Sequence, residues 1–205
     1  MSILPLGSER QKGLFCSPPR MRIIAGSAGG IRLKIPPNDL RPTMDMVREA
    51  AFSALAELVA GARVLDLFAG SGAYGIEALS RGAAEAVFVD NHPKAIESIR
   101  LNLSRTKLVG QVIRNDVFRF LKHPDNRYRL VFADPPYAKK AGDRDLAEEL
   151  MENESLVEAV EPGGLLVLEC SLIQEVGAFR YWEITRAKEY GSTKLLFCIP
   201  KKPAV

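Results

Sequence analysis

The chain has 205 residues, of which 47% are hydrophobic and 26% are charged, and its formal net charge at pH 7 is +3. This length and composition suit one globular domain with a sizeable core. No apolar run approaches the roughly 18 residues that a membrane helix needs, which excludes a membrane-spanning protein. The first twenty residues lack the apolar stretch of a signal peptide, so we expect a cytoplasmic protein.

Basic residues gather at both ends of the chain. Residues 1–41 carry seven basic and two acidic side chains, and residues 180–205 carry six basic and two acidic ones. This distribution fits either a polyanionic partner or an ordinary solvated surface. The three cysteines form no CxxC pair and the two histidines have no metal-ligand spacing, so we expect no metal site.

The N-terminal part divides into three expected segments. Residues 1–20 have no periodicity and contain several prolines and glycines, which predicts a flexible extension. Two β-prone runs, 22–25 and 31–35, flank a glycine-rich turn and predict a small β-hairpin appendage at residues 21–40. Thr43 is the expected N-cap of a helix that opens the main domain, residues 41–205. The apolar positions of that helix share one face: Val47, Ala50, Ala51, Ala54, Leu55 and Leu58.

From residue 63 onward, strand patterns alternate with helix patterns. Helices are expected after the glycine-rich segment to about residue 80, at 93–105 and at 145–160. The apolar strands between helices predict a parallel sheet covered on both faces, with strands at 64–68, 86–90, 111–114, 129–133 and 165–169. Runs 181–188 and 193–199 are joined by only four residues, so they must be antiparallel neighbours. The predicted fold class is α/β: a mostly parallel, doubly wound seven-stranded sheet with a terminal antiparallel hairpin, plus the small N-terminal β-hairpin.

Four strand ends carry polar or glycine-rich segments, and ligands bind at this edge of such sheets. The first three can hold an adenosine-containing ligand. Glycines allow close approach to a helix N-terminus, one aspartate can hold ribose hydroxyls and another can accept from an adenine amine. The candidate residues are Asp66, Phe68, Ala69, Gly70 and Gly72 at or just past the end of the first strand, Asp90 and Asn91 at the end of the second, and Asp116 and Val117 past the third.

The fourth strand ends in Asp134-Pro135-Pro136-Tyr137, the candidate catalytic motif. The Asp134 carboxylate and the Pro135 carbonyl can accept both N–H bonds of an exocyclic amine, while the Tyr137 ring covers the base. The prolines fix their own backbone and donate no N–H. A strand that simply ends in a Pro-Pro turn is the equal alternative for these four residues alone.

The glycine spacing also fits a dinucleotide site, because Gly70, Gly72 and Gly75 match the G-x-G-x-x-G fingerprint. Asp66, four residues before Gly70, would crowd a pyrophosphate but suits a cationic amino-acid group. An NAD site also leaves the 134–137 motif unexplained. The residues therefore favour S-adenosylmethionine over NAD as the cofactor.

Together, several strings resemble the RsmD family. They are residues 21–26 (MRIIAG), 41–49 (RPTMDMVRE), 67–72 (LFAGSG), the 134–137 motif and 190–193 (YGST). The resemblance implies a monomeric class I methyltransferase with a Rossmann-like fold, which methylates the exocyclic amine, N2, of one guanine in 16S ribosomal RNA. The implied partner is ribosomal RNA or a partly assembled small subunit. Residues expected to contact its phosphates are Arg22, Arg32, Lys34, Arg41, Lys139 and Lys140.

Some alternatives stay open at this point. A methyltransferase acting on DNA adenine or protein glutamine uses similar motifs, and a non-catalytic RNA-binding assembly module could keep the same fold. Arg48 and Glu49 fit a structural role, bracing the helix, as well as a substrate role.

Overall fold

The computed structural model describes residues 21–36, 44–122, 127–138, 142–172 and 179–201. The predictions made for residues 1–20, for Thr43 as an N-cap and for Arg41, Lys139 and Lys140 as RNA contacts lie outside these residues. Within the described ranges, no helix combines the length and the apolar character required to cross a membrane.

The protein is built on one seven-stranded sheet whose strands lie in the order β3-β2-β1-β4-β5-β7-β6. All pairs from β3 to β5 are parallel, and β7 is antiparallel to both of its neighbours. The strands are β1 Arg63–Leu67, β2 Glu85–Asp90, β3 Gln111–Arg114, β4 Tyr128–Ala133, β5 Val160–Ser171, β6 Trp182–Tyr190 and β7 Thr193–Pro200. The predicted fold class, including the antiparallel terminal hairpin, is confirmed. The order reverses between β1 and β4, which makes their carboxyl ends the topological switch point.

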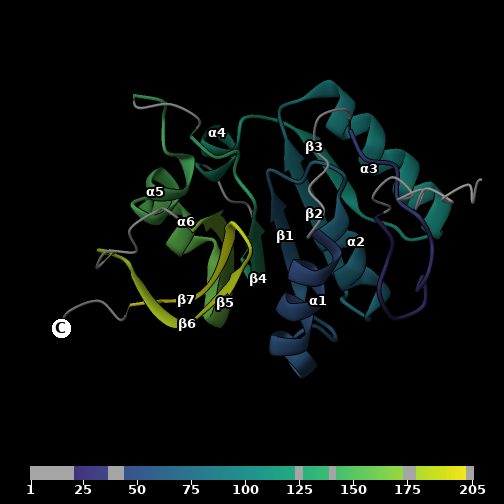
Figure 1. The fold of residues 1–205 in the computed structure, drawn as a ribbon, viewed down its shortest axis with the longest axis horizontal. Helices are drawn as coiled ribbons and strands as arrows, with labels where there is room; N and C mark the ends of the chain where they lie inside the picture. Colours follow the sequence, from purple (N-terminus) through teal and green to yellow (C-terminus); the bar gives the residue numbers. More distant parts are fainter. Residues whose placement is uncertain (1–20, 37–43, 123–126, 139–141, 173–178, 202–205) are drawn as a thin grey trace, which may run out of the picture.

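Helices cover both faces of this sheet, as Figure 1 shows. They are α1 Met44–Leu55, the 3-10 helix η1 Ala56–Leu58, α2 Ala73–Ser80, α3 Pro93–Thr106, α4 Val117–Leu121, α5 Leu146–Met151 and α6 Glu154–Glu158. One core cluster contains residues of α1, α2 and α3, and the other contains residues of α4, α5 and α6. Side chains alternate between the two clusters along a strand: in β4, Leu130 and Phe132 join the first, whereas Val131 and Ala133 join the second.

Residues 21–36 form a turn that packs on the first core cluster. A single antiparallel bridge joins Arg22 to Arg32, and the Ile23 N–H donates to the Ile31 carbonyl at 2.9 Å. Met21, Ile23 and Leu33 are buried in the same cluster as α1 and α2. The hairpin is therefore shorter than two full strands. Its separation from the main domain as an appendage remains a prediction.

Two helix predictions need correction. The helix expected over 145–160 is split into α5 and α6, because the Asn153 side chain accepts the Leu156 N–H at 3.0 Å and caps a new helix start. Leu58 is exposed instead of buried, because the chain changes from α1 to η1 before reaching it. The short helix α4 was not predicted at all.

Candidate active site

One pocket of about 770 Å³ opens at the carboxyl ends of the parallel strands. It is lined by residues at or just after the carboxyl ends of β1, β2, β3 and β4, together with residues of β5 and of helices α1 to α5. Ten of the predicted cofactor and catalytic residues line it: Asp66, Phe68, Ala69, Gly70, Asp90, Asn91, Asp116, Asp134, Pro136 and Tyr137. The structure therefore places the adenosine-binding candidates and most of the 134–137 motif around one continuous space.

The other three predicted residues, Gly72, Val117 and Pro135, do not line this pocket. Gly72 adopts φ +76° beneath α3, where an added Cβ would lie 3.2 Å from Ile99. Val117 is buried in the second core cluster. Pro135 lines a neighbouring cavity of about 220 Å³. Their direct contact with ligands remains a prediction, and the structure gives Gly72 and Val117 packing roles.

The loop between β1 and α2 contains two residues with left-handed backbone angles and is hydrogen-bonded to the end of β2. Phe68 and Gly70 both have left-handed backbone angles, with φ +54° and +53°. The Gly70 N–H donates to Asp90 Oδ2 at 2.9 Å, which ties this loop to the end of β2. A left-handed phenylalanine is an uncommon, strained residue, and such strain concentrates at ligand sites.

Asp66 is a buried residue of the pocket lining, with 3% of its surface exposed. It accepts the Gly75 N–H at 2.9 Å and so fixes the first turn of α2. Burial raises the pKa of Asp66 to about 8. A cationic group brought into the pocket would favour the charged carboxylate, which fits the ammonium of an amino-acid moiety.

Asp90, the last residue of β2, and Asp116, which follows β3, also accept hydrogen bonds from backbone N–H groups. Asp90 accepts the His92 N–H through Oδ1 at 2.8 Å, in addition to the Gly70 N–H at Oδ2. Asp116 is the N-cap of α4 and accepts the Arg119 N–H at 3.0 Å. Since a carboxylate offers about four acceptor positions, these bonds still allow ligand hydroxyl or amine donors.

The 134–137 motif runs from the end of β4 toward β7. The Asp134 N–H donates to the Leu67 carbonyl at 3.4 Å, which keeps Asp134 beside the end of β1. The Tyr137 hydroxyl and Thr193 Oγ1 lie 3.1 Å apart. Pro136 is exposed within the pocket. The motif is thus anchored at both ends and presents a carboxylate and a ring to one space.

Among the other residues that line the pocket, Arg48, Tyr74 and Glu169 form polar contacts and were not among the predicted site residues. The Tyr74 hydroxyl donates to Glu169 Oε2 at 3.0 Å, and burial raises the pKa of Tyr74 well above its usual value. Glu169 interrupts an apolar strand in the same way as Asp134 ends one. That pattern was the available signal for Glu169; Tyr74 had no comparable signal.

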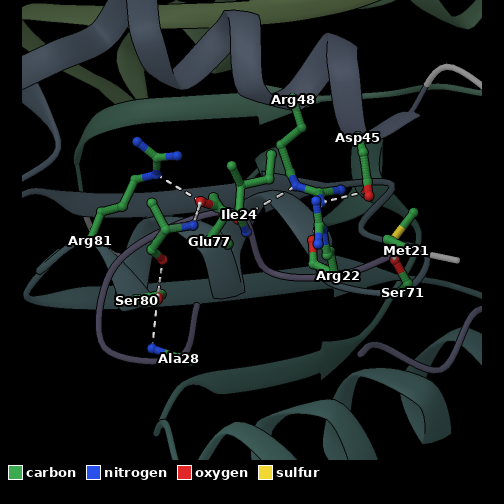
Figure 2. Close-up of polar contacts among 12 residues, drawn as sticks. Met21, Arg22, Ile24, Ala28, Asp45, Arg48, Ser71, Glu77, Ser80 and Arg81 are labelled. Carbon is green, nitrogen blue, oxygen red and sulfur yellow. Dashed lines mark hydrogen bonds and ion pairs between the residues drawn. The ribbon is translucent and has the colours of Figure 1, made fainter. Parts of the chain in front are cut away.

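Arg48 belongs to a buried polar network that joins α1 and α2 to residues 21–28 (Figure 2). Its guanidinium donates to the Arg22 carbonyl and to Asp45 Oδ1, the latter at 2.9 Å, and its Nε lies 3.7 Å from Glu77 Oε2. Glu77 accepts the backbone N–H groups of Ile24 and Ala25 at 2.7 and 3.0 Å. These contacts give Arg48 a bracing role, while Glu49 is exposed on α1.

The predicted RNA-contacting residues that the structure describes lie outside the pocket. Arg22 and Arg32 are exposed partners of the antiparallel bridge. Lys34 is half-buried and forms a surface ion pair with Glu97 at 2.8 Å. Their contact with RNA remains a prediction.

Comparison with known proteins gives the family. Residues 21–199 match the family described as Conserved hypothetical protein 95. Ribosomal RNA small subunit methyltransferase D of Escherichia coli (strain K12) is 38% identical over 122 residues, covering 58% of this chain and 62% of that protein, which is less than two thirds of its length. The Haemophilus influenzae protein of the same name is 32% identical over 177 residues, covering 83% of this chain and 89% of that protein.

Solved structures agree with this match. A hypothetical protein of Thermus thermophilus superposes with a TM-score of 0.71 at 33% identity, covering 86% of this chain and 98% of that one. The family match includes every pocket-lining residue and the whole sheet except Pro200, the last residue of β7. From its sequence, its sheet order and its relatives, this chain belongs to the RsmD family of methyltransferases.

Proposed function

We propose that this protein transfers the methyl group of S-adenosylmethionine to N2, the exocyclic amine, of one guanine in 16S ribosomal RNA. The observation that carries the proposal is the continuous pocket that joins the Asp66–Gly70 loop to Asp134 and Tyr137. The names of the E. coli and H. influenzae relatives, ribosomal RNA small subunit methyltransferase D, support the substrate class.

The cofactor half of the pocket is the part lined by residues at the carboxyl ends of β1, β2 and β3. Asp66 would pair with the amino-acid ammonium, Asp90 would accept from ribose hydroxyls, and Asp116 would accept from the adenine amine. Bound S-adenosylmethionine would supply an electrophilic methyl group. The Asp66 carboxyl group, whose pKa burial raises to about 8, supports this fit because a buried acid is stabilised in its charged form by a cation that arrives with the ligand.

The acceptor half is the 134–137 motif. Guanine's amine is a poor nucleophile, because its lone pair is delocalised into the ring. Hydrogen bonds to the Asp134 carboxylate and the Pro135 carbonyl would direct that lone pair toward the methyl carbon. Alignment of this kind supplies on the order of 7–11 kcal/mol in favourable cases. Asp134 would then stabilise the positive charge that develops on the nitrogen, and Tyr137 would stack on the base.

The basic residues would position the RNA. Arg22, Arg32 and Lys34 lie on the turn that packs against α1 and α2. Arg22 and Arg32 are exposed and Lys34 is half-buried, and surface cations at such a place suit phosphate contacts. Arg41, Lys139 and Lys140 complete the proposed set. The proposed partner is ribosomal RNA, either free or within a partly assembled small subunit, bound by a monomer.

The deciding experiment is transfer of labelled methyl groups to ribosomal RNA from cells that lack this protein, followed by mapping of the modified base. We expect one labelled guanine in 16S RNA, modified at N2. Label on DNA adenine or on protein glutamine instead would overturn the substrate assignment. Binding of RNA without any methyl transfer would identify a non-catalytic assembly module.

Asp134→Ala tests the catalytic assignment. We expect it to lower methyl transfer by about 100- to 1,000-fold, because a preorganised charge facing the reacting nitrogen is lost. Isothermal titration should show S-adenosylmethionine binding to be nearly unchanged, since Asp134 lies outside the cofactor half. Glu85→Gln, on an exposed ion pair with Arg63, is the matched control and should keep full activity. Near-normal turnover of Asp134→Ala would contradict the mechanism.

A further inference from the structure

A second carboxylate lies beside Asp134 in the pocket. Ala133 of β4 pairs with Leu168 of β5 in the parallel register, so Asp134 and Glu169 follow them at neighbouring positions. Phe132 and Val167, two residues earlier on each strand, both face the first core cluster. Because side chains alternate along a strand, Asp134 and Glu169 start toward this same face, and both line the pocket.

Tyr74 holds Glu169 in place. Its hydroxyl donates to Glu169 Oε2 at 3.0 Å, while its ring stacks on Phe132 with centroids 5.0 Å apart. Burial, then the charges of Glu169 and Asp134, raise the pKa of Tyr74 well above its usual value, so the phenol keeps its proton. The Tyr74 hydroxyl therefore holds the Glu169 carboxylate, which has only 6% of its surface exposed.

Two adjacent acceptors match the donors of guanine. Guanine presents its ring N1–H beside its N2 amine, whereas 2-aminopurine has the same amine beside an N1 that carries no hydrogen. An ionised carboxylate only accepts hydrogen bonds and has about four acceptor positions, so Glu169 can accept from Tyr74 and a ring N–H together. The same carboxylate would repel the lone pair of an unprotonated N1.

We propose that Glu169 accepts the N1–H of the target guanine while Asp134 accepts from its amine, which makes Glu169 a specificity-determining residue. This inference rests on the proposed function, since it assigns a second contact to the same base. A site that is built to accept from a substrate N–H strongly rejects an analogue without it. Stacking by Tyr137 alone would give no such selection.

The test replaces the mapped guanine of the 16S RNA with 2-aminopurine, by ligation of a synthetic fragment. We expect the wild-type protein to methylate guanine with a kcat/KM at least about 100-fold above that for 2-aminopurine. Glu169→Gln, whose amide can donate to N1, should lose activity on guanine and narrow this ratio to less than about 10-fold.

Two control variants separate base reading from a structural role. Tyr74→Phe removes the hydrogen bond to Glu169 but keeps the carboxylate, so it should slow both substrates and preserve the preference for guanine. Glu85→Gln should change neither rate nor preference. If Glu169→Gln slows both substrates by the same factor, Glu169 only supports Tyr74 and the inference is overturned.

The wild-type measurement distinguishes a failure of the role proposed for Glu169 from a failure of the proposed function. It does not depend on whether any variant folds. A wild-type protein that methylates guanine and 2-aminopurine equally well overturns the role of Glu169 but leaves the proposed function intact. A wild-type protein that methylates neither base overturns the proposed function itself.

Discussion

At the scale of single residues, two aspartates that line the pocket also hold backbone N–H groups. Asp66 fixes Gly75 and faces the pocket, and Asp90 fixes Gly70 and His92 in the same way. The sequence identified these aspartates as ligand contacts, because Asp66 shortly precedes the glycine-rich segment and Asp90 ends an apolar strand. It did not reveal that each also holds backbone N–H groups, since those bonds depend on how the following loop turns back.

Asp66→Asn tests how much the burial of the Asp66 carboxyl group lowers the stability of the folded protein when that group is ionised. The pKa of Asp66 rises from 3.8 to about 8 on folding, so the folded protein holds this proton more tightly than the unfolded chain. The wild-type free energy of unfolding must therefore fall as pH rises from about 4 to about 8. An asparagine side chain does not titrate, so the free energy of unfolding of Asp66→Asn should not show this fall with pH.

We expect the stability advantage of Asp66→Asn over wild type to grow by about 2–4 kcal/mol between about pH 5 and about pH 8. Urea unfolding at several pH values measures it directly. Parallel pH profiles for the two proteins would show that the Asp66 pKa is not raised. The same variant should weaken S-adenosylmethionine binding, because the proposed partner of the ammonium is lost.

At the scale of elements, the turn at residues 21–36 is attached to α2 by backbone contacts around Ser80. The Ser27 N–H donates to the Ser80 carbonyl at 2.8 Å, and the Ala28 N–H donates to Ser80 Oγ at 2.9 Å. Glu77, one turn earlier on α2, holds Ile24 and Ala25 (Figure 2). The local sequence pattern predicted the two β-prone runs. It did not predict that they pack on a helix more than fifty residues away in the chain.

Gly26→Ala tests this attachment. Gly26 has φ +84°, and an added Cβ would lie 1.9 Å from the Ser80 carbonyl oxygen, so the turn or α2 would have to move. Gly30 has nearly the same φ, +83°, with nothing within 4 Å of an added Cβ, and Gly30→Ala is therefore the matched control.

We expect Gly30→Ala to lower the free energy of unfolding by about 1–2 kcal/mol, the cost of a left-handed alanine. Gly26→Ala should lower it by at least about 3 kcal/mol, because the clash with backbone adds to that cost. Chemical denaturation of both variants and of the wild type measures these two losses in the free energy of unfolding. Equal losses would mean that the turn is not closely packed on α2.

At the scale of the whole molecule, the pocket exists only when the parallel strands lie in register. Residues from five strand ends, from Asp116 after β3 to Glu169 in β5, contribute to one space. Both core clusters contribute to holding these strands, since side chains alternate between the two faces of the sheet. Ligand binding should therefore be coupled to the folding of the whole sheet.

The single tryptophan provides a measurement of that coupling. Trp182 is buried in β6, at the edge of the sheet farthest from β3, and it does not line the pocket. S-adenosylmethionine at about 100 times its Kd should stabilise the protein by about 2.7 kcal/mol. Thermal unfolding followed by Trp182 fluorescence should show one transition, shifted upward by the cofactor. If S-adenosylmethionine did not shift the transition seen by Trp182 fluorescence, β6 and β7 would unfold independently of the strands that form the pocket.

The sequence by itself determined the strand-helix alternation, the antiparallel end of the sheet and the acids at the strand ends, because each depends on residues close together in the chain. Tertiary structure decided which distant residues meet. Tyr74 and Glu169 are 95 residues apart, and β7 lies between β5 and β6. Such contacts depend on strand order and register, which leave no local pattern, so only the folded sheet shows that Glu169 stands beside Asp134.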